Sequence, residues 1–130
     1  MTVVLSYHGN QESEAALDEA LRAARFRETT LVVVLAAQTG EEDPRTVEDA
    51  EDRLWAHLGR ADVAFEVRRT CIDQDVADAV LDAAARTGAE CIVLGLRPGG
   101  SGRAAIGPNA TRILLDAPCP VVTTTPRSQS

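Results

Sequence analysis

A glycine-rich loop between two apolar runs carries the residues best suited to bind a ligand. Residues 90–125 read ECIVLGLRPGGSGRAAIGPNATRILLDAPCPVVTTT, which predicts a buried strand, a loop, a short helix and a second buried strand. Backbone N–H groups and a helix N-terminus would then lie at the carboxyl end of a strand. Both features favour negative charge, so the pattern indicates a binding site for phosphate groups.

The candidate binding residues share a place on this loop or at the end of the first apolar run: His8, Gly95, Arg97, Gly99, Gly107 and Asn109. The glycines let the backbone approach a phosphate closely, and Arg97 supplies positive charge. Asn109 can either cap the short helix or donate its side-chain amide. Against this, Pro98 and Pro108 stand where backbone donors would be useful, and proline has no N–H.

The elements that position this loop alternate regularly along the chain. Strands are expected at residues 2–7, 30–37, 63–71, 90–95 and 120–125, and helices at residues 11–25, 44–59, 75–87 and 109–116. Alternation of this kind predicts an α/β fold with a parallel, doubly wound sheet and right-handed crossovers. We expect one domain over residues 1–126, followed by a flexible tail at residues 127–130.

Composition excludes several classes of protein. The formal net charge is −7, which argues against binding to nucleic acid or to an anionic membrane surface. No apolar run approaches the length of a membrane span, and the first residues do not resemble a signal peptide. Cys71, Cys91 and Cys119 lack metal-site spacing, so we interpret them as reduced thiols and expect a cytoplasmic protein.

Four segments, taken in order, resemble the universal stress protein family along nearly the whole chain. The segments are VVLSYHGNQESEAALDEAL, the stretch after Cys71, AECIVLG and the closing phrase DAPCPVVTTTP. The resemblance implies an open sheet of strand order 3-2-1-4-5 with helices on both faces, the adenine-nucleotide alpha-hydrolase-like fold. His8 and Gly95 would then meet at the topological switch point, where open α/β sheets bind ligands.

The glycine loop departs from the pattern Gly-x2-Gly-x9-Gly-Ser/Thr of the nucleotide-binding members. Gly95 and Gly107 match the first and third glycines, but 11 residues separate them, one fewer than the pattern needs. Pro98 takes the place of the second glycine, and Pro108 replaces the hydroxyl residue. His8 replaces an acidic residue of the family, and neutral histidine is a poor magnesium ligand. We therefore predict no competent ATP site, no cofactor and no bound metal.

The resulting hypothesis is a regulatory, stress-adaptive domain that acts by association. The closing strand, Val121–Thr124, is an apolar sheet edge, and the resemblance implies a homodimer formed through it; a further regulatory protein partner is expected but not identified. One alternative is a switch in which ATP or AMP binds the loop over residues 95–109. A second alternative is a slow ATPase, but no catalytic constellation is evident, so no enzyme is predicted.

Overall fold

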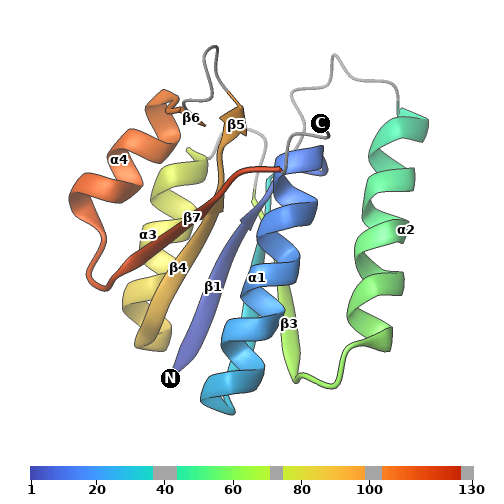
Figure 1. Cartoon of the computed structure of the whole chain (residues 1–130), viewed down its shortest axis with the longest axis horizontal. Helices are drawn as coiled ribbons and strands as arrows, with labels where there is room; N and C mark the ends of the chain where they lie inside the picture. Colours follow the sequence, from blue (N-terminus) through green and yellow to red (C-terminus); the bar gives the residue numbers. More distant parts are fainter. Residues whose placement is uncertain (37–43, 71–74, 99–103, 127–130) are drawn as a thin grey trace.

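The computed structural model describes residues 1–36, 44–70, 75–98 and 104–126 (Figure 1). Its centre is a parallel sheet made of β1 (Thr2–Tyr7), β2 (Thr30–Leu35), β3 (Phe65–Arg69), β4 (Ala89–Gly95) and β7 (Val121–Thr124). The spatial order is β3-β2-β1-β4-β7. Since β7 is the fifth strand of this sheet in the chain, the predicted order 3-2-1-4-5 is confirmed. The predicted tail, residues 127–130, lies outside the described residues.

The central strand β1 is buried on both faces. It pairs with β2 through Val4 and Val32, and with β4 through Val4 and Ile92. All six of its residues are buried. A parallel strand covered on both sides needs a continuous apolar run and not an alternating one, which explains the composition of this segment.

Two pairs of helices cover the sheet. They are α1 (Gln11–Arg27) and α2 (Pro44–Arg60) on one face, and α3 (Val76–Thr87) and α4 (Pro108–Asp116) on the other. Leu17 and Leu54 pack on the first face, while Val80 and Ile113 pack on the second. Figure 1 shows α1 in front of the sheet and α3 behind it. None of the helices in the described part of the chain is long and apolar enough to cross a membrane.

The helix ends follow local chemistry. Asn10 caps α1, because its Oδ1 accepts a hydrogen bond from the Ser13 N–H at 2.9 Å. Gly88 ends α3 in the left-handed conformation, with φ of 63°. The end of α1 differs from the prediction, since the helix runs to Arg27 and stops at Glu28, whose φ is 53°. A left-handed glutamate carries no sequence signal of the kind that glycine provides.

Several strands are shorter than predicted, and one small sheet was not predicted. β2 ends at Leu35. β3 covers only Phe65–Arg69, the residues that pair with Leu31–Leu35 of β2. The far ends of both predicted strands, residues 37 and 71, lie outside the described part. A separate antiparallel pair joins β5 (Arg97–Pro98) to β6 (Ala104–Ala105). Strands of two residues are too short to show a periodic pattern.

Candidate ligand-binding cleft

A cleft of about 390 Å³ opens where β1 and β4 end. Its walls come from three segments of the chain: His8, Asn10, Glu12, Gly95, Leu96, Arg97, Ile106, Gly107, Pro108, Asn109 and Ala110. The predicted site residues His8, Gly95, Arg97, Gly107 and Asn109 therefore lie together at the switch point. The remaining one, Gly99, lies outside the described residues.

His8 follows β1 directly and is held by two neighbours. Its backbone N–H donates to Ser13 Oγ at 2.8 Å, and its ring Nε2 lies 3.1 Å from Ser6 Oγ. Protein atoms packed around the imidazole disfavour its charged form and lower the pKa of His8, although part of the residue reaches solvent. Glu12 opposes this shift and Arg97 adds to it. His8 is consequently a neutral hydrogen-bonding group at pH 7.

Gly95 has a structural role that the sequence pattern did not indicate. A Cβ atom at this position would lie 2.2 Å from the backbone oxygen of Glu12 and 2.6 Å from its carbonyl carbon. The first turn of α1 therefore packs directly against the β4 backbone. At Gly107 an added Cβ would meet no atom within 4 Å. Of these two cleft glycines, only Gly95 is required by packing within the protein.

Glu12 is a member of the cleft that the sequence analysis missed. Its Oε2 accepts a hydrogen bond from Arg97 Nε at 3.2 Å, across 85 residues of sequence. The Glu12 side chain is 14% exposed and that of Arg97 is 78% exposed, so the carboxylate is the more deeply held partner. An acidic residue in the first turn of a helix is ordinarily explained by the helix dipole. Only the tertiary structure reveals its pairing with Arg97.

The N-terminus of α4 forms the opposite wall. Gly107 is the N-cap residue, with no side-chain hydrogen bond, and Pro108 occupies the first turn. The Thr111 N–H already donates to the Gly107 carbonyl at 2.9 Å. Of the two roles considered for Asn109, capping this helix is therefore not the one observed: Pro108 suits the first helical position, and Gly107 becomes the N-cap residue. The amides of Asn109 and Ala110 remain as the donors of this turn.

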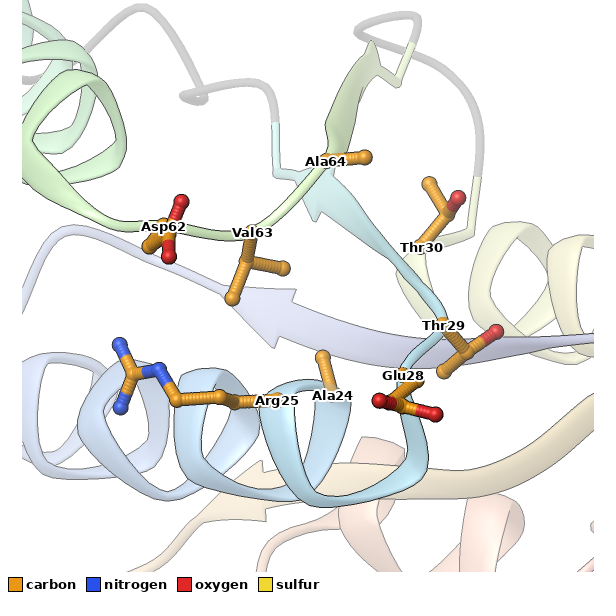
Figure 2. A pocket seen from close by; sticks show the side chains of 8 residues that line it. All are labelled: Ala24, Arg25, Glu28, Thr29, Thr30, Asp62, Val63 and Ala64. Atoms are coloured by element: carbon orange, nitrogen blue, oxygen red, sulfur yellow. The ribbon is translucent and has the colours of Figure 1, made fainter.

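A second hollow of about 520 Å³ lies at the other end of the sheet (Figure 2). It is lined by Ala24, Arg25, Glu28, Thr29, Thr30, Asp62, Val63 and Ala64. Figure 2 shows the Arg25 and Asp62 side chains towards one end of it and Glu28 towards the other. It is the larger hollow, but it lies at the amino ends of β2 and β3, whereas open α/β sheets bind ligands at the carboxyl ends. The cleft at β1 and β4 is therefore the candidate site.

Metal-ligating side chains do not gather in the part of the chain that the structure describes. Within residues 1–36, 44–70, 75–98 and 104–126, no group of three or more His, Cys, Asp or Glu residues could hold a metal ion. Among the described residues of the cleft wall, Glu12 is the one acidic group, and it pairs with Arg97.

Comparison with known proteins identifies the class to which this fold and cleft belong. The family model "Universal stress protein family" matches residues 1–124. A universal stress protein of Mycolicibacterium smegmatis is 31% identical over 127 residues, covering 95% of this chain and 97% of that protein. The chain therefore belongs to the universal stress protein family, a family of stress-related domains.

Further relatives agree with this assignment. A universal stress protein of Mycobacterium tuberculosis is 31% identical over 140 residues, and this chain spans about half of its length, 48%. A solved structure from Burkholderia pseudomallei has a TM-score of 0.68 and 29% identity, covering 97% of this chain and 96% of that one. Another, from Archaeoglobus fulgidus in complex with dAMP, has a TM-score of 0.69 and 21% identity, covering 95% and 96%.

Proposed function

We propose that this universal stress protein domain is a regulatory domain of the cytoplasm that acts by association, as a homodimer formed through β7. We further propose that its cleft does not hold ATP tightly. The observation that carries the first proposal is the contrast between the two edges of the sheet. The free thiols Cys91 and Cys119 are compatible with a reducing compartment.

The two edge strands differ in charge. On β3, Glu66 and Arg68 form an ion pair, and Arg69 pairs with Glu51 of α2. Charged side chains on an edge discourage pairing with another chain. On β7 the sequence is Val-Val-Thr-Thr, with no charged residue and with Thr123 exposed. One edge is therefore protected against association, and the other is open to it.

The hydrogen bonds of β7 show which of its backbone groups face outward. The carbonyls of Pro120 and Thr124 accept hydrogen bonds from the N–H groups of Ile92 and Leu96. In a parallel ladder, alternate residues direct their N–H and C=O groups to opposite sides. The backbone groups of Val121 and Thr123 consequently face away from β4. A second copy related by a two-fold axis would pair with these groups in antiparallel fashion.

A proline scan of this edge tests the dimer. Thr123→Pro removes an outward N–H and leaves the ladder with β4 intact, so we expect a folded monomer. The matched control Thr123→Ala keeps the N–H and should stay dimeric. Sedimentation equilibrium at micromolar concentration, with circular dichroism for folding, measures both. A monomeric wild-type protein would refute the proposal, as would a Thr123→Pro variant that remains a folded dimer.

The proposal for ATP is supported by the composition of the cleft. Pro108 lacks both the N–H and the hydroxyl that a serine or threonine would offer to a terminal phosphate. Arg97, which could meet a phosphate, is already paired with Glu12. Neutral His8 adds no positive charge. We therefore expect no affinity for Mg-ATP better than about 100 μM, which corresponds to roughly 5.5 kcal/mol of binding free energy.

Isothermal titration calorimetry of Mg-ATP into the purified chain checks this expectation. Pro108→Ser restores an N–H and a hydroxyl at the start of α4 and should strengthen ATP binding. Pro118→Ser, at an exposed proline between α4 and β7, is the matched control and should have no effect. A dissociation constant of the wild-type protein for Mg-ATP in the low micromolar range would contradict the proposal.

A second candidate function is the binding of an adenine mononucleotide. The cleft volume of about 390 Å³ falls within the usual range for small-molecule sites. The Archaeoglobus fulgidus relative, which shares this fold, was solved with dAMP. Denaturing the purified protein and measuring adenine absorbance in the supernatant tests whether such a ligand co-purifies.

A further inference from the structure

The Glu12–Arg97 ion pair determines the charge of the cleft. Among the described residues of its wall, Glu12 and Arg97 alone carry a formal charge at pH 7. They are joined at 3.2 Å, so their charges cancel locally. Glu12 also lies in the first turn of α1, where the helix dipole stabilises its carboxylate. An incoming phosphate would have to compete with this carboxylate for Arg97.

The remaining walls suit an uncharged ligand that carries hydroxyl groups. Leu96, Ile106 and Pro108 offer apolar surface to a flat ring. The amides of Asn109 and Ala110 offer donors, and the Glu12 carboxylate is an acceptor. Hydroxyl groups can donate and accept at once, and therefore match both sides of the cleft. A phosphate group only accepts at neutral pH, and it would bring negative charge next to Glu12.

We propose that the cleft binds an uncharged nucleoside in preference to its phosphorylated forms, and that Glu12 enforces this preference by engaging Arg97. This inference rests on the proposed absence of a tight ATP site, and it adds the class of ligand and the residue that selects it. Glu12 therefore determines specificity because its carboxylate pairs with Arg97, the one cation among the described residues of the wall.

The test compares adenosine with AMP by calorimetry, without added metal ions. The wild-type protein should bind adenosine at least about threefold more tightly than AMP. Glu12→Gln removes one negative charge and frees Arg97, so the ratio of AMP affinity to adenosine affinity should rise on the order of tenfold. Adenosine binding should change little, because the glutamine oxygen still accepts a hydrogen bond. Glu19→Gln, on the same helix in the exposed pair with Arg22, is the control of equal charge change.

A reciprocal variant keeps the inference testable if the Glu12→Gln protein does not fold. Arg97→Gln leaves Glu12 without its partner, so AMP binding should weaken further while adenosine binding persists; Arg22→Gln is its matched control. Because the charges of Glu12 and Arg97 cancel among the described residues of the wall, added salt should weaken the binding of AMP to the wild-type protein only slightly. Thermal melts confirm that each variant is folded.

Three results would overturn the inference. They are tighter binding of AMP than of adenosine by the wild-type protein, an affinity ratio in Glu12→Gln equal to that in Glu19→Gln, and no binding of adenosine at millimolar concentration. Failure here is distinguishable from failure of the proposed function. Tight binding of Mg-ATP contradicts the proposed function, whereas an absence of all binding overturns only the nucleoside preference.

Discussion

Replacing Gly95 by alanine isolates the packing requirement at the centre of the cleft. The added Cβ would lie 2.2 Å from the Glu12 backbone oxygen, more than 1 Å inside the 3.4 Å at which ordinary contacts begin. The obstacle is backbone, so no side chain can rotate away. The first turn of α1 is itself pinned, because Ser13 bonds both to Asn10 and to the His8 N–H. Either α1 or β4 must move, with loss of core packing.

Overpacking of this kind costs up to about 3 kcal/mol. For a domain of this size, such a loss lowers the melting temperature by roughly 10 °C. Differential scanning calorimetry measures the shift. Gly59→Ala is the matched control, because Gly59 lies in the last turn of α2 with no atom within 4 Å of the added Cβ. Since the added methyl group meets no atom, this control should not lower the melting temperature.

A Gly95→Ala protein that melts within about 2 °C of the wild type would refute the packing argument. It would mean that the contact between α1 and β4 is looser than the structure shows, and that the glycine serves only ligand approach. A variant that is destabilised in the absence of any ligand would support the structural role. The experiment therefore separates the two explanations for a glycine at this position.

Two further predictions concern groups around the end of β1. Tyr7→Phe removes a buried hydroxyl that donates a hydrogen bond to Glu14 Oε1, and the loss of this hydrogen bond should lower the free energy of unfolding in urea by about 1–2 kcal/mol; an unchanged midpoint would contradict this. The pKa of His8 is lowered in the folded protein by burial, so the unfolded chain takes up the proton first as the pH falls through the usual histidine value of about 6.5. The free energy of unfolding should therefore decrease from pH 7 to pH 5, and His8→Gln should make this decrease smaller. If the free energy of unfolding changes equally with pH in both proteins, the pKa of His8 is not lowered by folding.

Much of the fold could be predicted because its signals are local. The apolar run of β1 and the alanine and leucine stripe of α1 identify their elements without reference to the rest of the chain. Asn10 at the start of α1 and Gly88 at the end of α3 act through hydrogen bonds and backbone angles within a few residues. Strand order required the family resemblance in addition, because alternation alone allows more than one arrangement.

Errors arose where an element depends on a partner. The end of β3 is decided by the length of β2, beside which it pairs, and not by its own alternating sequence. β5 and β6 are strands only because they pair with each other, Arg97 with Ala105 and Pro98 with Ala104. The start of α4 depends on competition between Gly107 and Asn109 for the cap, which Pro108 decides in favour of Gly107.

The sequence by itself determined the elements and their alternation, and with the family resemblance it indicated that His8, Gly95, Arg97, Gly107 and Asn109 surround one cleft. Tertiary structure alone decided what these residues do there. The Glu12–Arg97 pair joins residues 85 positions apart, and the close approach of α1 to Gly95 depends on how one helix sits on one strand. Periodicity encodes which face of an element is apolar. It does not encode the distance between two elements, and that distance decides which charges cancel and which glycine is required.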